Sequence, residues 1–152
     1  METFKNYFKS ILVPVLVGVI IGLITSKFND FDSLVKPFLA PPAILFPIVW
    51  TILYILMGIS YGILKNKSLT DANVDFIYYS QLIVNALWPI FFFVLKWRLF
   101  SFFWIILLGV LVAIMIYTFY KKDKVAGLLQ IPYILWVLFA TYLNFGFYIL
   151  NR

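Results

Sequence analysis

Indole rings, phenol rings and single amides recur at helical spacing in three uncharged stretches of this chain. Residues three or four apart share one face of a helix, so each set predicts a stripe along a helix. The stripes are Phe46, Trp50 and Tyr54; Gln81, Asn85, Trp88 and Phe92; and Leu129, Pro132, Trp136, Ala140 and Asn144. Facing one another, they would enclose a mostly apolar space with a few directional hydrogen-bonding groups.

Such walls have the usual composition of a small-molecule site. A flat, conjugated, hydrophobic ligand could stack on Trp50, Trp88 and Trp136. Buried indole and phenol groups need hydrogen-bond partners, which Asn85, Asn144 and Gln81 could supply. The alternative is that the rings only pack the core or anchor the protein at the membrane surface, and the pattern alone leaves both interpretations open.

Other kinds of chemistry have few candidates in the sequence. The chain has no His and no Cys, which removes the usual metal and haem ligands and any disulfide. No long uncharged run contains a carboxylate, so ion-driven transport has no evident titrating group. We therefore predict no metal site, no cofactor and no hydrolytic centre. Asp32 and Lys36 are interpreted as solvated loop charges.

The charged residues define the elements that carry the stripes. They fall in short clusters that leave five uncharged runs, at 10–26, 37–64, 76–95, 99–120 and 125–151. About 20 apolar residues cross a bilayer, and a snorkelling Lys9 would extend the first run. The sequence thus predicts an all-α membrane protein, a single bundle over 1–152. Its five transmembrane helices are expected at about 7–26, 43–64, 76–95, 99–120 and 125–150.

Composition and charge agree with a membrane setting. Hydrophobic residues make up 64% of the chain and charged residues 12%, against about a quarter charged in soluble proteins. The net charge of +6 suits anionic lipid head groups, and its distribution in flanking pairs argues against a nucleic-acid partner. Basic residues slightly favour a cytoplasmic N-terminus. The first run lacks a cleavage site, so we expect an integral protein of a bacterial inner membrane.

The connections add two expectations. The longest, 27–42, is proline-rich and joins the first two spans; prolines stiffen it and prevent a helix. A loop of this length is often a lid, and a plain tether is the alternative. The turn at 96–98 is so short that the spans on either side must be antiparallel neighbours.

Gly18 and Gly22 give the first span a flat face on which another helix can approach closely. This face could serve internal packing or a homodimer contact.

The motifs resemble those of the translocator protein family, whose members are also called tryptophan-rich sensory proteins. Pro41 and Pro42 with residues 46–54 resemble the first loop and second helix of that family. The stripe from Gln81 to Phe92 resembles its third helix, and residues 132–144 resemble its fifth. The likeness covers nearly the whole chain in the same order. One departure is that Phe31 and Leu39 stand where the first loop of the family often carries Trp.

The resemblance implies a membrane receptor or sensor that binds porphyrins in a pocket between helices, closed by the first loop. It also suggests light-dependent porphyrin degradation, for which Trp50 and Trp136 would be the redox-active side chains. Alternatives are a facilitated transporter of tetrapyrroles or lipids, and a structural or interaction protein. The full set of expected pocket residues is Pro41, Pro42, Phe46, Trp50, Tyr54, Gln81, Asn85, Trp88, Phe92, Trp136, Ala140 and Asn144.

Overall fold

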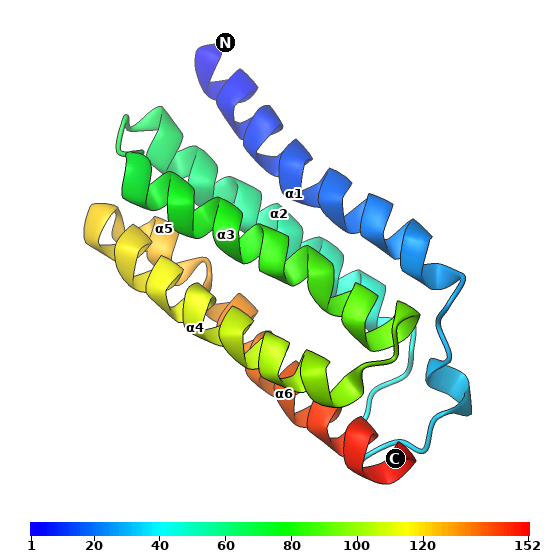
Figure 1. The fold of residues 1–152 in the computed structure, drawn as a ribbon. Helices are drawn as coiled ribbons and strands as arrows, with labels where there is room; N and C mark the ends of the chain where they lie inside the picture. The colour runs from blue at the N-terminus through cyan, green and yellow to red at the C-terminus, as the bar shows by residue number, and fades with distance from the viewer.

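The computed structural model describes all residues from 1 to 152. Most of them form long helices that run side by side (Figure 1). The helices are α1 (Glu2–Ser26), α2 (Leu45–Asn66), α3 (Ala72–Pro89), α4 (Arg98–Lys122), α5 (Lys124–Leu128) and α6 (Ile131–Asn151). Two short elements complete the chain: a 3₁₀ turn, η1 (Phe31–Ser33), and a π-helical segment, η2 (Ile90–Val94). There are five spans long and apolar enough to cross a membrane, since η2 continues α3 and α5 precedes α6. The predicted five-span, all-α fold is confirmed.

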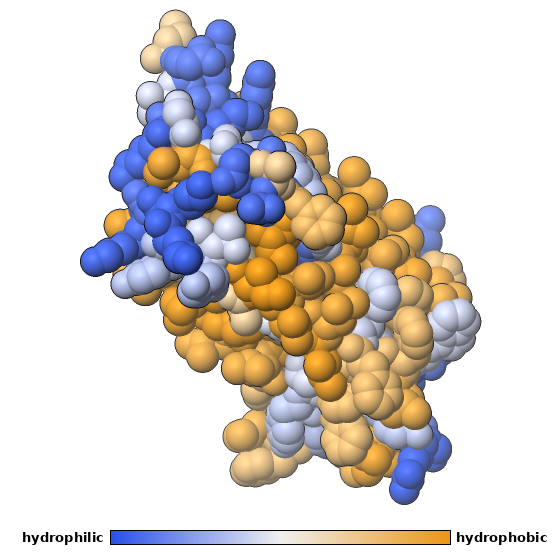
Figure 2. Space-filling view, turned by 60° about the vertical axis from the view of Figure 1, so that its left-hand side comes forward, coloured by the Kyte–Doolittle hydropathy of each residue, from blue (hydrophilic) through white to orange (hydrophobic).

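The ends of the bundle are polar and its middle is apolar. The N-terminus and C-terminus lie at opposite ends in Figure 1, as an odd number of spans requires. Figure 2 shows hydrophilic residues gathered at the two ends with a hydrophobic band between them. This is the surface that a bilayer demands, because its hydrocarbon core cannot hydrate charged groups.

Two spans are less regular than the sequence suggests. The fifth is interrupted between Leu128 and Ile131, because Pro132 lies at the start of α6 and has no N–H to continue the hydrogen-bond ladder. The third widens into η2 directly after Pro89 for the same reason. Prolines are tolerated in membrane helices where neighbouring groups satisfy the freed carbonyls.

Capping sets where the polar turns end. The Asp71 carboxylate accepts a hydrogen bond from the Val74 N–H at 2.9 Å, so α3 begins at Ala72 and not near Phe76 as expected. The Asp123 carboxylate caps α5 through the Ala126 N–H at 3.0 Å. The turn between η2 and α4 is tight, with Lys96 at a positive φ of 57°. The prediction that the spans flanking this turn are antiparallel neighbours is confirmed (Figure 1).

Glycines let α1 approach α2 closely. A Cβ on Gly58 would stand 2.7 Å from the Ser10 carbonyl oxygen and closer still to the Ile11 backbone. A Cβ on Gly62 would meet the Tyr7 ring at 2.7 Å. Gly58 and Gly62 on α2, which were not predicted as packing residues, therefore join these helices. Gly18 on α1 also serves internal packing, as one of the two expectations held, because a Cβ there would collide with the Tyr54 ring.

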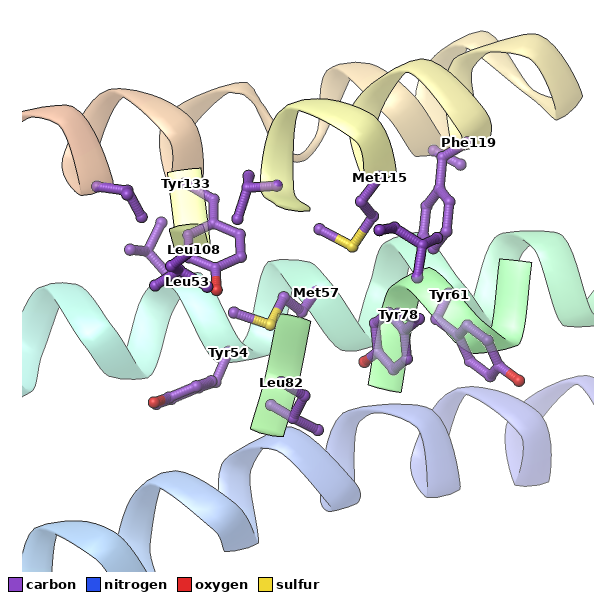
Figure 3. Close-up of a cluster of buried hydrophobic side chains, with 14 of the residues drawn as sticks. Leu53, Tyr54, Met57, Tyr61, Tyr78, Leu82, Leu108, Met115, Phe119 and Tyr133 are labelled. Carbon is purple, nitrogen blue, oxygen red and sulfur yellow. The ribbon is translucent and has the colours of Figure 1, made fainter. Parts of the chain in front are cut away.

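The densest core fills the half of the bundle nearest the N-terminus. Met57 and Tyr61 of α2, Tyr78 of α3 and Phe119 of α4 meet there, with Tyr61 and Tyr78 stacked at 4.5 Å between ring centroids (Figure 3). A second, smaller cluster lies beneath the 27–44 loop at the other end. It consists of Phe31, Phe92, Leu143 and Phe147.

Candidate functional site

A cavity of about 540 Å³ occupies the half of the bundle nearest the 27–44 loop. Its walls come from α1, α2, α3 and α6, while Ile105 and Leu108 of α4 also contribute. This volume falls within the range of ordinary small-molecule sites. We call this cavity the chamber.

Three helices bring most of the predicted stripe residues to the chamber wall. The predicted residues that line it are Phe46, Trp50, Tyr54, Asn85, Trp88, Phe92, Ala140 and Asn144. Trp50 lies 5.7 Å from Tyr54 between ring centroids, and Trp88 stacks on Phe92 at 5.1 Å. Thus α2 and α3 each present an indole backed by a second ring.

The floor of the chamber is a buried chain of hydrogen bonds across three helices. The Tyr54 hydroxyl donates to Asn85 Oδ1, and Asn85 Nδ2 donates to the Tyr133 hydroxyl, both at 2.7 Å. The Tyr133 hydroxyl in turn donates to Gln81 Oε1 at 2.7 Å, and Gln81 Nε2 donates to the Tyr78 carbonyl at 2.9 Å. Asn85 and Gln81 therefore satisfy buried phenols, as expected. Fully satisfied networks of this kind fix helix positions.

The second amide holds the opposite wall. Trp88 Nε1 donates to Asn144 Oδ1 at 2.8 Å, and Ser101 Oγ donates to the same oxygen at 3.0 Å. Asn144 Nδ2 donates to the Arg98 carbonyl at 2.9 Å. The prediction that Asn144 partners an indole is confirmed for the partly buried Trp88, and the contacts of Asn144 join α3, α4 and α6.

Four expected pocket residues do not line the chamber. Gln81 lies below the floor, where it supports Tyr133. Pro41 and Pro42 precede α2 and lie outside the wall, and the loop residues that line the chamber are Asn29, Phe31 and Ala43. Trp136 packs behind Phe46 at 5.8 Å between centroids, and its buried Nε1 has no hydrogen-bond partner.

Several residues of the site were not predicted from the sequence. Tyr133 does not line the chamber but lies at the centre of the floor network, and it could have been found as a mid-span phenol that needs a partner. The face of α1 that lines the chamber, including Val15, Val19 and Leu23, carries no aromatic residue that would indicate a site. Phe147 and Phe31 meet edge to face at 5.3 Å, a contact across the loop that no local pattern indicates.

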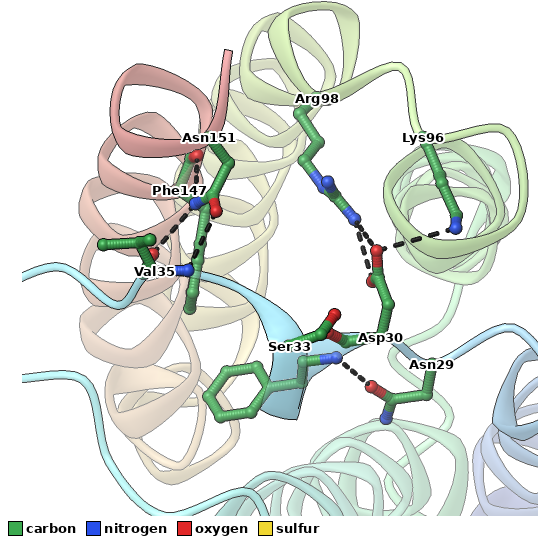
Figure 4. Close-up of polar contacts among 9 residues, drawn as sticks. Asn29, Asp30, Ser33, Val35, Lys96, Arg98, Phe147 and Asn151 are labelled. Carbon is green, nitrogen blue, oxygen red and sulfur yellow. Dashed lines mark hydrogen bonds and ion pairs between the residues drawn. The ribbon is translucent and has the colours of Figure 1, made fainter.

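The 27–44 loop is tied down at its two sides. Arg98 Nη2 donates to both Asp30 carboxylate oxygens, at 2.8 and 2.7 Å, and Lys96 Nζ lies 3.6 Å from Asp30 (Figure 4). Asn151 exchanges two 2.8 Å hydrogen bonds with the Val35 backbone. Burial alone would raise the pKa of Asp30, but the Arg98 hydrogen bond and the charges of Arg98 and Lys96 hold it below its ordinary value.

Charge is absent from the chamber wall and present just outside it. No charged residue lines the chamber. Lys36 Nζ stands 5.0 Å from the centroid of Phe31, whose ring does line it. A hydrophobic body would thus find an uncharged enclosure, while an anionic end would find a cation beside the loop.

The fold and the chamber define a five-helix membrane protein with an internal aromatic cavity. Residues 10–150 match the model of the TspO/MBR family, and the chain belongs to that family. A tryptophan-rich protein TspO from Archaeoglobus fulgidus is 41% identical over 122 residues, which cover 80% of this chain and 79% of the relative. One from Chlorobaculum tepidum is 38% identical over 128 residues, 80% of this chain and 78% of the relative. A translocator protein homolog from Schizosaccharomyces pombe is 33% identical over 97% of this chain and 93% of its own length.

Proposed function

We propose that the protein is a membrane receptor for flat hydrophobic ligands, with porphyrins as the leading class, and that the chamber is the binding site. The observation that carries the proposal is the chamber itself: about 540 Å³, free of charge and flanked by the rings of Trp50 and Trp88. A conjugated macrocycle would stack on these rings. Its carboxylates would stay at the loop end, where Lys27 and Lys36 are exposed.

The closed floor supports a receptor over a transporter. A ligand that crossed the bundle would have to break the chain of bonds from Tyr54 through Asn85 to Tyr133. Below that chain lies the dense core around Met57, which is fully buried. Each buried polar group left without a partner costs about 1–3 kcal/mol, so the floor opposes a continuous passage.

A slow photochemical activity is the finer part of this proposal. Trp50 lines the chamber and lies 6.2 Å from Tyr133 between ring centroids, so its indole would be next to a bound ligand. In the proposed reaction Trp50 would give one electron to the excited ligand, and dissolved dioxygen would be the terminal oxidant. Trp136 is separated from the chamber by Phe46. Illuminated protoporphyrin should therefore bleach more slowly with Trp50→Phe than with Trp136→Phe, measured as loss of the porphyrin absorbance band.

The test of binding is titration of the purified protein in nanodiscs with protoporphyrin, followed by porphyrin absorbance. Trp50→Leu should weaken binding roughly fivefold, because one aromatic contact contributes about 1 kcal/mol. Ala140→Phe should weaken it further by filling the chamber, which Ala140 lines. The matched control is Trp97→Leu, an exposed indole at the 96–98 turn. Saturable binding with the wild-type affinity in both Trp50→Leu and Ala140→Phe would show that the chamber is not the binding site.

A further inference from the structure

We infer that the chamber exchanges its ligand with the lipid, through an opening between α1 and α2, and not through the loop end. This inference rests on the proposed function, since it names the route and the source of the ligand for that same site. The ligand class that follows is an amphiphile dissolved in the bilayer, with a planar apolar body that enters sideways.

The opening is made of residues that line the chamber and are exposed on the outside of the bundle. Val19 and Leu23 of α1 are 51% and 65% exposed, although both belong to the chamber wall. Gly22, Ser26, Pro47 and Thr51 share both properties. We call these six residues the α1–α2 gap; four lie on α1 and two on the facing side of α2.

The divergence of the two helices explains the gap. At Gly58 and Gly62 the helices touch, and at Gly18 the ring of Tyr54 fills the space where a side chain would stand. One turn further along α1, a Cβ on Gly22 would meet nothing within 4 Å. Moreover, α1 packs mainly on α2 and lies at the edge of the bundle (Figure 1), so no other span covers this opening.

The chemistry of the gap suits an apolar guest. None of its six residues is charged. Its two hydroxyls are already used within their own helices, since Ser26 Oγ donates to the Leu23 carbonyl at 2.9 Å and Thr51 Oγ1 donates to the Pro47 carbonyl at 2.7 Å. The side chains of the gap therefore offer no free hydrogen-bond donor, and a charged end of a ligand would remain outside, near Lys27.

The other ways out are closed by specific contacts. At the loop end, a ligand would have to displace Phe31, which is 4% exposed, and separate Asp30 from Arg98. Towards the N-terminal half it would have to break the floor network at Asn85. At the α1–α2 gap no hydrogen bond or ion pair has to break, and the chamber-lining residues there are already exposed.

The test compares exchange rates of protoporphyrin in nanodiscs. Gly22→Leu adds bulk to the gap where the structure has open space, so it should slow dissociation tenfold or more, because a bound ligand then has to leave past a larger side chain. Gly109→Leu on α4 is the matched control, because its Cβ makes only an ordinary contact with Val137 at 3.7 Å and lies outside the chamber. Its rates should stay at the wild-type values.

A second variant tests the loop route directly. Asn151→Ala removes both hydrogen bonds to Val35 and loosens the loop. We expect exchange rates within twofold of wild type. The inference is overturned if Asn151→Ala accelerates exchange while Gly22→Leu leaves it unchanged. Raising the lipid concentration at fixed total ligand should also lower the association rate, because the rate follows the ligand-to-lipid ratio.

A ligand-free arm separates this inference from the proposed function. In a variant that retains only Trp50, lipids with brominated acyl chains should quench its fluorescence, and Gly22→Leu should reduce the quenching. Absence of quenching overturns the gap, whatever the protein binds. Absence of saturable porphyrin binding by the wild type, with quenching present, overturns the proposed function and leaves the gap as an entrance for another lipid-soluble molecule.

Discussion

The two halves of this bundle are built from the same five spans but pack differently. Near the N-terminus, α1 and α2 meet at Gly58 and Gly62, and large side chains such as Tyr78 and Phe119 fill the interior. Near the loop, the helices diverge, and the aromatic rings line a chamber and do not fill it. The closed half therefore provides the stability that lets the other half remain hollow.

The difference follows from where small residues and prolines lie. Without a hydrophobic force between helices in lipid, close approach depends on van der Waals contact at small side chains. Five of the seven prolines lie in the other half, where Pro47 and Pro89 line the chamber. Substitutions in the two halves should therefore have unequal effects.

The largest effect is expected at the tightest contact of the closed half. In Gly58→Ala the new Cβ would press on the backbone of Ser10 and Ile11, which cannot move as a side-chain tip would. Overpacking against backbone should cost about 3 kcal/mol of unfolding free energy, measured by denaturation in mixed micelles.

The same substitution in the hollow half is the control. Gly22→Ala meets open space, so it should stabilise α1 by about 0.5–1 kcal/mol through the lower flexibility of alanine. Equal effects of the two variants would contradict the distinction between a closed and a hollow half.

The second test concerns the hydrogen-bond network at Asn85, which separates the closed half from the hollow half. Asn85→Leu keeps the volume but leaves the Tyr54 hydroxyl without its acceptor and removes a donor to Tyr133. We expect a loss of about 2 kcal/mol, seen in the same denaturation assay. Adding Tyr54→Phe should recover part of it, because the stranded hydroxyl is then gone. A purely additive double variant would show that the network is not coupled.

The five spans could be predicted because charge is excluded from long runs, and that constraint acts on each segment by itself. The stripe on α3 was placed correctly for the same reason, since Asn85 and Trp88 need an interior in which to find partners. Trp136 was placed less well. Steps of four residues advance about 40° around a helix of 3.6 residues per turn, so a stripe counted that way rotates off the inner face. The buried face of α6 instead follows Tyr133, Val137, Ala140 and Asn144.

The loop contacts could not be predicted from local pattern. Asp30 meets Arg98 across 68 positions of sequence, and only the folded bundle brings them together. The face of α1 that lines the chamber could not be predicted from the sequence either, because an apolar residue that faces lipid and one that faces a chamber have the same character. Local propensity therefore specifies the spans, whereas tertiary contacts specify which of their faces enclose the site.

The third test concerns the ion pair between Asp30 and Arg98, which holds the 27–44 loop at the end of the hollow half. Asp30→Asn leaves Arg98, which is 12% exposed, without its ion pair, and should cost about 1.5 kcal/mol. Because the folded pKa of Asp30 lies below the ordinary 3.8, its contribution is complete above that pH. It is lost as the pH falls from 3.8 towards the folded pKa. Thermal melting across this range should show a steeper acid loss for wild type than for Asp30→Asn.

The smallest effect is expected from the same change in the closed half. Asp123 pairs with Lys67 as Asp30 pairs with Arg98, and a hydrogen bond from Lys67 likewise lowers its pKa. Lys67, however, is 59% exposed, so water replaces the lost partner. Asn is as good an N-cap as Asp, and the cap on Ala126 should survive.

Asp123→Asn should therefore change the free energy of unfolding by less than about 0.5 kcal/mol, against the larger loss for Asp30→Asn. Melting of both variants side by side at pH 7 decides the point. A matching loss at Asp123 would mean that ion pairs at the two ends contribute equally. The stability of the loop would then come from Phe31 packing and not from the buried guanidinium. An unchanged free energy of unfolding for Asp123→Asn, together with a clear loss for Asp30→Asn, would instead show that burial of Arg98 strengthens its ion pair with Asp30.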